Sequence, residues 1–209
     1  MSKPVLALAF LLAARAPAGD RPFVPLFDGR TLAGWTQIGG KPGNWGVEDG
    51  QIVARGLGKD WLSTNRPYGD FVLRLEYRTG PAGNSGVLLR APHRGDPSFD
   101  GLEVQILDDD APAYRSLQPA QYAGSIYGVV AARRGAARKA GEWNALEIRA
   151  AGPAVTVDLN GIRVVDAGLD RHPEALSRHP GLRRAGGFLG LQSHGDRAWF
   201  RGLEIRELP

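Results

Sequence analysis

The sequence predicts an all-β fold, a sandwich of two antiparallel sheets. Many short segments alternate apolar and polar residues, which is the period of a strand with one buried face. Gly, Pro, Asn and Asp separate these segments at short intervals, and almost no stretch shows a helical period. About a dozen short strands spaced in this way are typical of a two-sheet sandwich.

The clearest alternation lies between residues 70 and 110. In residues 71–78, Phe71, Leu73, Leu75 and Tyr77 point one way, and the charged residues Arg74, Glu76 and Arg78 point the other. In residues 102–106, the apolar side chains likewise oppose Glu103 and Gln105. Residues 85–90 follow a loop rich in Gly, Pro and Asn, so we expect them to return as an antiparallel neighbour of the first strand. These registers predict one non-core face that carries four polar side chains: Glu76, Arg78, Glu103 and Gln105.

Other strands are expected on both sides of this stretch. Residues 45–54 predict a hairpin with Asp49-Gly50 at its turn, and residues 154–166 predict another at Asn160-Gly161. Residues 187–195 alternate and place Gln192 and His194 on one side. The long segment 111–141 is predicted as a loop, with a candidate short strand at 124–128. A loop of this length in a compact domain is more often functional than structural.

The amino terminus has the pattern of a secretory signal peptide over residues 1–18. Lys3 precedes an apolar run at residues 5–14, and small residues follow it. The alternative is a membrane anchor, but the run is about half the roughly 20 residues that a spanning helix needs. We therefore expect residues 19–209 to form a single domain that is periplasmic or secreted, without a membrane span.

The composition limits both how the chain is stabilised and which partners it can bind. The chain has no cysteine, so it has neither a lipoprotein acceptor nor a disulfide, and burial of a core must stabilise it. Its one basic cluster, residues 133–139, has no interleaved aromatic side chains, which argues against a nucleic-acid partner. The sequence leaves the oligomeric state open.

Six segments together resemble the 3-keto-disaccharide hydrolase domain family. They are LFDGRTLAGW, WGVEDGQIV, DFVLRLEYR, NSGVLLR, GLEVQILDD and GFLGLQSHG, in this order, and the resemblance covers essentially the whole mature chain. It implies a concanavalin A-like jelly-roll sandwich and action on small sugars whose 3-hydroxyl has been oxidised to a ketone. The resemblance is stronger evidence for the fold of this chain than for its activity.

A ketone at C3 permits an unusual cleavage. It acidifies the proton on C2, and the C1 oxygen can then leave from the resulting enolate; addition of water gives net hydrolysis. This needs a base, an oxyanion stabiliser and an acid. The catalytic candidates are Glu76, Glu103 and His194, which we expect to converge on one concave pocket. The alternatives are carboxylates on a solvent face and a structural histidine.

Six further residues are candidates for binding substrate. Arg78 can orient an enolate, amide and hydroxyl groups can bind sugar hydroxyls, and an aromatic ring can stack on a sugar. The structural alternatives are an arginine on an exposed strand face at position 78 and a simple turn at residues 84–86. The candidates are Arg78, Asn84, Ser85, Gln105, Tyr127 and Gln192.

Two further questions stay open at this stage. No cofactor is certain, and a divalent metal is possible, although residues 108–110 lack a matching ligand set and are typical of a solvated strand end. The alternative to an enzyme is a non-catalytic carbohydrate-binding module on the same sandwich. Conventional glycoside hydrolysis by Glu76 and Glu103 is less favoured, because the chain has no E-x-D-x-E run.

Overall fold

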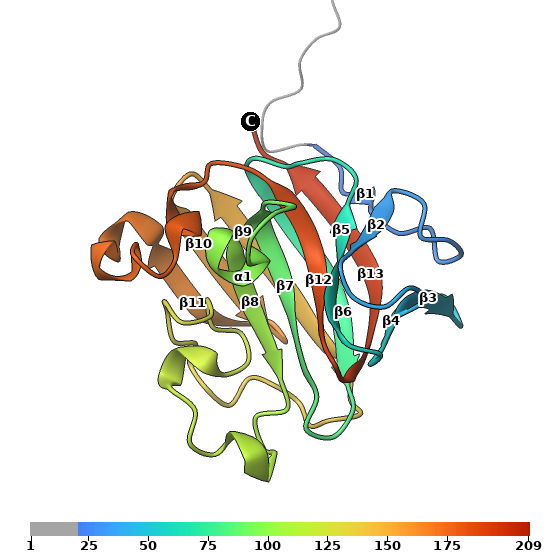
Figure 1. The fold of residues 1–209 in the computed structure, drawn as a ribbon. Coiled ribbons are helices and arrows are strands. Elements are labelled where there is room, and N and C mark those ends of the chain that lie inside the picture. The colour runs from blue at the N-terminus through green and yellow to red at the C-terminus, as the bar shows by residue number, and fades with distance from the viewer. Residues whose placement is uncertain (1–20) are drawn as a thin grey trace, which may run out of the picture.

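The computed structural model describes residues 21–209 and confirms the all-β sandwich of two antiparallel sheets (Figure 1). The predicted signal peptide, residues 1–18, lies outside the described residues. Within the described part of the chain, no helix is long and apolar enough to cross a membrane.

One sheet has eight strands. Seven of them run in the order β11-β10-β9-β6-β13-β4-β3, and β1 pairs with β13. The strands are β1 (Val24–Pro25), β3 (Trp45–Glu48), β4 (Gln51–Arg55), β6 (Phe71–Thr79), β9 (Asn144–Ala151), β10 (Ala154–Leu159), β11 (Ile162–Gly168) and β13 (Arg197–Glu207).

The second sheet has five strands in the order β2-β5-β12-β7-β8 and lies toward the viewer in Figure 1. Its strands are β2 (Trp35–Ile38), β5 (Lys59–Thr64), β7 (Asn84–Ala91), β8 (Leu102–Leu107) and β12 (Phe188–His194). A single short α-helix in the described chain, α1 (Pro97–Asp100), contacts β7 and β8. Five short 3-10 helices complete the described elements: Pro112–Tyr114, Pro119–Gln121, Leu169–Arg171, Pro173–Ala175 and Pro180–Arg183.

The apolar faces of the two sheets meet in one core. Alternate residues of β6 and of β8 belong to this core, as their periodicity predicts. The remaining residues of each strand therefore face outward. The core residues of these two strands are Phe71, Leu73, Leu75, Tyr77, Leu102, Val104 and Ile106.

The predicted pairing of residues 85–90 with residues 71–78 is wrong. Residues 80–83 carry the chain from one sheet to the other, so β6 pairs with β9 and β13, whereas β7 pairs with β8 and β12. Alternation reports which side chains are buried but not which sheet a strand joins. The outward faces of β6 and β8 consequently lie on opposite sides of the molecule.

Both predicted hairpin turns are present. Asp49 and Gly50 have φ values of 49° and 73°, and Asn160 and Gly161 have values of 52° and 78°. Two consecutive positive φ values match the type I′ turn that suits the twist of a hairpin. In the long loop, Ile126 forms an isolated bridge to Val104 of β8, so this part of the loop covers the edge of the five-stranded sheet.

Candidate active site

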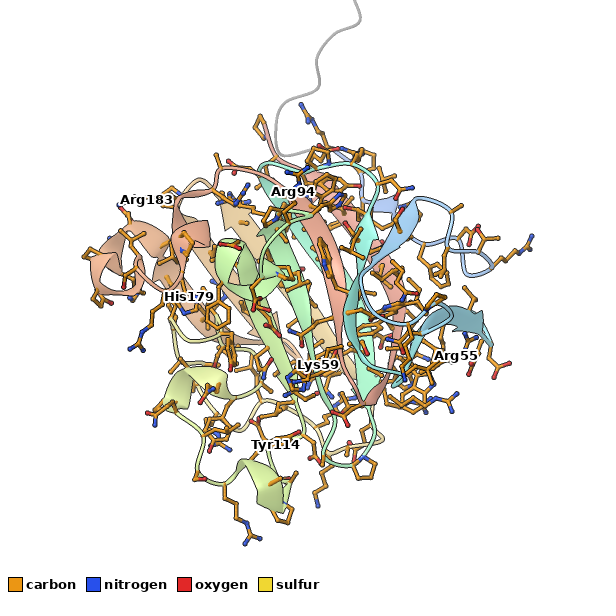
Figure 2. The ribbon with its side chains drawn as sticks, in the orientation of Figure 1. Arg55, Lys59, Arg94, Tyr114, His179 and Arg183 are labelled. Carbon is orange, nitrogen blue, oxygen red and sulfur yellow. The ribbon has the colours of Figure 1, made fainter. Side chains whose placement is uncertain are left out.

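A cavity of about 620 Å³ opens on the outward face of the five-stranded sheet. Strands β5, β7, β8 and β12 form its floor, and α1 with the residues before it forms part of its wall. Lys59, which lines it, is labelled on the near face of the molecule in Figure 2. Six of the predicted site residues line it together: Asn84, Glu103, Gln105, Tyr127, Gln192 and His194.

Two predicted residues lie elsewhere because β6 belongs to the other sheet. Glu76 pairs with Arg201 at 2.8 Å on the outward face of the eight-stranded sheet. The Arg78 guanidinium stacks over Trp143 and Trp199, with its central carbon 5.0 and 4.6 Å from the ring centroids. The prediction that Glu76 shares a pocket with Glu103 is therefore wrong, and Arg78 does not reach that pocket.

Ser85, predicted to bind substrate, does not line the cavity either. It is buried, and its hydroxyl donates to the Gln192 carbonyl oxygen at 2.6 Å. It has the parity of Val87 and Leu89, which belong to the core between the sheets. Its side chain therefore holds β7 to β12, while its neighbour Asn84 lines the cavity.

Glu103 is the buried carboxyl group of this cavity, with only 3% of the residue exposed. Gln192 Nε2 donates to its Oε2 at 3.0 Å. In the amide orientation that satisfies both of its ends, Gln105 Nε2 donates to Oε1 at 3.1 Å. Burial raises the pKa of Glu103 to about 7, and Asp96 adds to this increase, whereas hydrogen bonds from Ser98 and Gln192 oppose it.

A glycine makes room for this carboxyl group. Gly86 lies on β7, between β8 and β12, opposite Gln105 on one side and Gln192 on the other. A Cβ atom at Gly86 would collide with the Glu103 carboxylate. The side chain of Glu103 therefore crosses the space that any other residue at position 86 would fill.

His194 lies at the rim of the cavity. It ends β12 and pairs with Lys59 of β5, which also lines the cavity. Partial burial and the nearby Lys59 charge lower the pKa of His194, and Asp196 acts against them. The neutral imidazole is therefore favoured at neutral pH, so His194 can accept a proton or a hydrogen bond more readily than it can act as a cation.

Aromatic rings form two walls. The Trp61 indole lies over Gly190, where a Cβ atom would collide with it. Phe99 packs edge-on against Tyr127, with ring centroids 6.1 Å apart, and His179 supports it from behind at 4.8 Å. Aromatic walls around a few polar groups are the usual setting for a sugar ring.

Sequence reasoning gave no role to several lining residues. Lys59, Asp96, Ser98 and Phe99 lie in segments without clear alternation. The one available signal was Asp96-Pro97, since Asp96 caps α1 by accepting from the Ser98 amide at 3.0 Å. That signal predicts a helix start, but it does not place the helix over β8.

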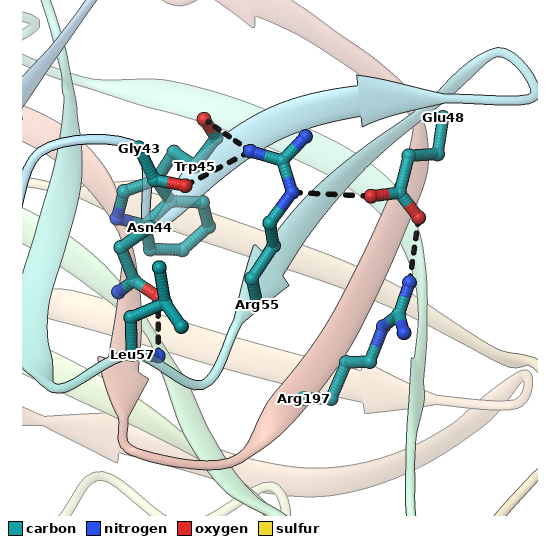
Figure 3. A network of polar contacts seen from close by, with 7 residues as sticks. All are labelled: Gly43, Asn44, Trp45, Glu48, Arg55, Leu57 and Arg197. Atoms are coloured by element: carbon teal, nitrogen blue, oxygen red, sulfur yellow. Dashed lines mark hydrogen bonds and ion pairs between the residues drawn. The ribbon is translucent and has the colours of Figure 1, made fainter.

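A polar network fixes the start of β5, next to the cavity. Asn44 Oδ1 accepts from the Leu57 amide at 2.8 Å, and Arg55 donates to the Gly43 carbonyl at 2.9 Å (Figure 3). Asn44 and Trp45 also donate to the buried carboxylate of Asp60, at 2.7 and 2.8 Å. These contacts hold the strand that carries Lys59 and Trp61.

No group of three or more His, Asp or Glu residues within 21–209 is arranged to hold a metal ion. In the acidic run, Asp108 Oδ2 accepts from the Ala82 amide at 2.8 Å and Asp109 Oδ1 accepts from the Ala123 amide at 2.9 Å. These two carboxylates therefore anchor loops.

Similar proteins are found both by sequence and by structure. Residues 22–206 match the family described as the 3-keto-alpha-glucoside-1,2-lyase-like domain. A 3-keto-disaccharide hydrolase from Bacteroides thetaiotaomicron is 27% identical over 228 positions, which cover 89% of this chain and 78% of that protein. The solved structure of a protein assigned as a glycosyl hydrolase, from Parabacteroides distasonis, is 30% identical with a TM-score of 0.78, over 90% of this chain and 100% of that one.

A more distant structure shares only the fold. The carbohydrate-binding module CBM66 from Bacillus subtilis is 15% identical with a TM-score of 0.57, over 83% of this chain and 96% of that module. The family match, in contrast, spans nearly all of the described residues. The chain belongs to the 3-keto-alpha-glucoside-1,2-lyase-like domain family.

Proposed function

We propose that this protein cleaves 3-keto-glycosides at C1 after removing the proton on C2. The observation that carries the proposal is the Glu103 carboxyl, buried in a sugar-sized cavity with a pKa of about 7. The family and the relative named a 3-keto-disaccharide hydrolase support the same substrate class.

The first step is proton abstraction. Glu103 in its carboxylate form takes the C2 proton, and the electron pair of the C–H bond moves onto the C3 ketone oxygen as an enolate. A carboxylate whose conjugate acid has a pKa of about 7 is a stronger base than an ordinary one. Gln192 and Gln105 fix its two oxygens, so the base is already oriented when substrate enters.

The enolate oxygen needs a positive or hydrogen-bonding neighbour. Lys59 and Asn84 line the cavity and supply an ammonium and an amide group on its floor. Such donors are most effective when they are fixed before the charge develops and are shielded from water. Lys59 lies on a strand that the Asn44 and Trp45 contacts to Asp60 hold in place.

The second step breaks the C1–O bond. The enolate reforms the C3 carbonyl, C1 and C2 become doubly bonded, and the leaving oxygen takes a proton from water at the open end of the cavity, near His194. The hydroxide left by that proton transfer then adds across the double bond: its oxygen binds C1, and Glu103, whose proton has exchanged with solvent while the aglycone leaves, delivers a proton to C2. The net change is hydrolysis, and Glu103 ends as it began.

The test compares a 3-keto-glucoside with its unoxidised parent in deuterium oxide. We expect the aglycone to be released from the ketone alone, and deuterium to appear at C2 of the product. Release from the parent at a similar rate would contradict the mechanism, whereas product without deuterium at C2 would show that Glu103 returns the abstracted proton before it exchanges with solvent. Binding of both sugars without release would instead support a carbohydrate-binding module.

We also propose that the protein is exported, on the amino-terminal pattern alone. Expression of the full chain in a bacterial host, followed by amino-terminal sequencing of the periplasmic and secreted fractions, tests this. We expect a mature chain that begins near residue 19. A full-length amino terminus in the cytoplasm would contradict it.

A further inference from the structure

A second cavity, of about 740 Å³, lies at the other end of the same sheet face. The segment 91–100 is a wall common to both cavities: residues 95–99 line the first, whereas residues 91–94 and Asp100 line the second. Arg94 and Arg183, which line the second cavity, lie near the top of Figure 2, above Lys59 of the first cavity. The mechanism above uses no residue of this second cavity.

The second cavity is basic. Arg94, Arg183 and Arg184 line it with His93, and Asp100 is its one acidic lining residue. Within residues 21–209, neither Arg94 nor Arg183 forms an ion pair, and neither side chain donates a hydrogen bond to another group. Like charges gathered in a concave site raise the local concentration of anions.

Part of this site is already ordered. Arg184 Nε donates to the Asp100 carbonyl oxygen at 2.8 Å, which leaves both of its terminal nitrogens free within the described chain. The Asp100 carboxylate turns away and accepts from the Asp96 amide at 2.9 Å. Two of the charged groups that line the cavity are therefore held by backbone contacts.

His93 is also fixed in place. Its ring stacks on Phe188 with centroids 3.6 Å apart, and its Nε2 lies 2.8 Å from the hydroxyl oxygen of the buried Ser63. Its Nδ1 has no partner within residues 21–209. The ring therefore forms a rigid side of the cavity, and Trp61 of the first cavity packs against its edge at 5.7 Å.

We propose that this cavity binds an oxyanion: a carboxylate, sulfate or phosphate group. Guanidinium groups match such anions because their donors form a planar fork. The anion is either a substituent on the aglycone of the sugar substrate, which reaches past the shared wall, or a free ion. The first case rests on the proposed function, and the second does not.

The first experiment measures binding by calorimetry, with 4-carboxyphenyl glucoside and the neutral 4-carbamoylphenyl glucoside as probes. We expect the carboxylate to bind about tenfold more tightly, as charge-assisted hydrogen bonds allow. The double variant Arg94→Gln/Arg183→Gln should abolish this preference. Arg184 is left intact because it contacts the backbone of α1.

A matched control makes the same change of charge elsewhere. Arg115→Gln/Arg133→Gln alters two exposed arginines in the long loop, and neither arginine forms an ion pair within the described residues. It should keep the tenfold preference. Equal binding of the two glucosides by the wild type would count against the aglycone substituent as the source of the anion.

The second experiment titrates sodium sulfate alone. Sulfate binding that only the Arg94→Gln/Arg183→Gln variant loses identifies a free anion as ligand, whereas a preference confined to the glucoside identifies the aglycone substituent. If the binding of both probes is unchanged in that variant, the proposal is overturned. The glucosides and sulfate carry no C3 ketone, and their binding needs no turnover. Failure of this proposal can therefore be told apart from failure of the proposed C2 proton abstraction.

Discussion

Glu103 shows how one residue can serve chemistry at the expense of stability. A carboxylate taken out of water is costly unless it is paired, and no cation pairs with Glu103 among the described residues. Hydrogen bonds from two glutamines replace part of its hydration. The remainder of the cost appears as a raised pKa, which is the property that a base at neutral pH needs.

The role of Glu103 as a base predicts a pH profile. Because the carboxylate is the active form, kcat/KM on a 3-keto-glucoside should rise with pH and level off above about 7. Glu103→Gln should lower kcat by roughly 10²–10⁴, the usual contribution of a positioned base. Initial rates between pH 5 and 9 test both statements. A profile that falls through this range would show that the acid form is the active one.

The same residue predicts how stability changes with pH. The pKa of Glu103 is raised in the folded state, so its contribution is present below the unfolded value, near 4.5, and is lost as pH rises through about 7. Glu103→Gln removes this loss. Relative to the wild type, the variant should gain about 2–3 kcal/mol in unfolding free energy between pH 4.5 and 8.

Urea denaturation at the two pH values measures this gain. His194→Ala is the control, since its pKa is lowered and it titrates in the opposite sense. An unchanged difference between wild type and Glu103→Gln across this range would show that the carboxyl group is not desolvated in the folded protein.

Gly86 gives a prediction about space. Gly86→Ala should lower kcat at least tenfold, because the new methyl group would displace the Glu103 carboxylate on which the proposed reaction depends. Its backbone has no positive φ, so the change in stability should come from this clash alone. Gly80→Ala is a matched control, since a Cβ atom there meets open space. Equal activity of the two variants would show that the reaction does not depend on the space left by Gly86.

At the scale of strands, local features were predictable and sheet membership was not. The Asn160-Gly161 turn follows from residue types that tolerate positive φ. The outward position of Glu103 follows from its apolar neighbours. The separation of Glu76 from Glu103 depends on where residues 80–83 lead the chain, and no local pattern encodes that.

The burial of Glu103 was equally hidden from the sequence. It depends on α1 and on the segment near Tyr127, which contacts β8 from a distant part of the chain. Glu76, which was expected to share the pocket, is not among the groups that shift the pKa of Glu103. In the structure, desolvation has the largest effect and Asp96 a smaller one.

The second hairpin can be tested directly. Gly161 has φ of 78°, and a Cβ atom there meets no other group, so substitution is opposed by backbone conformation alone. Gly161→Val should destabilise the domain by about 1–2 kcal/mol, since a β-branched residue resists positive φ. Gly161→Asn, which tolerates this region, should cost less. Equal melting temperatures for the two variants would show that the turn is not formed as described.

On the scale of the whole molecule, the two outward faces differ in kind. That of the eight-stranded sheet carries ion pairs and cation–π stacks, such as Glu76 with Arg201 and Arg78 with Trp143. That of the five-stranded sheet carries the Glu103 cavity and the basic cavity, whereas a smaller one, of about 490 Å³, lies beside Glu76 on the eight-stranded sheet.

One buried ion pair joins the two sheets. Arg90 on β7 is 1% exposed, and it donates to Asp70, just before β6, at 2.9 Å. It also donates to the carbonyl oxygens of Gly152 and Arg184, at 2.8 and 3.0 Å. The contacts to Asp70 and Gly152 cross from one sheet to the other, and the contact to Arg184 reaches the second cavity.

Asp70→Asn should therefore destabilise the whole domain. The change leaves the Arg90 cation buried without its counter-charge, which costs about 3–5 kcal/mol in fully buried pairs. Asp70 is partly exposed, so we expect about 2–3 kcal/mol, measured by urea denaturation. Asp158→Asn is the matched control, because Asp158 pairs with an exposed Arg163 and should cost less than about 1 kcal/mol. Similar losses in both variants would show that the Arg90 contact does not join the sheets.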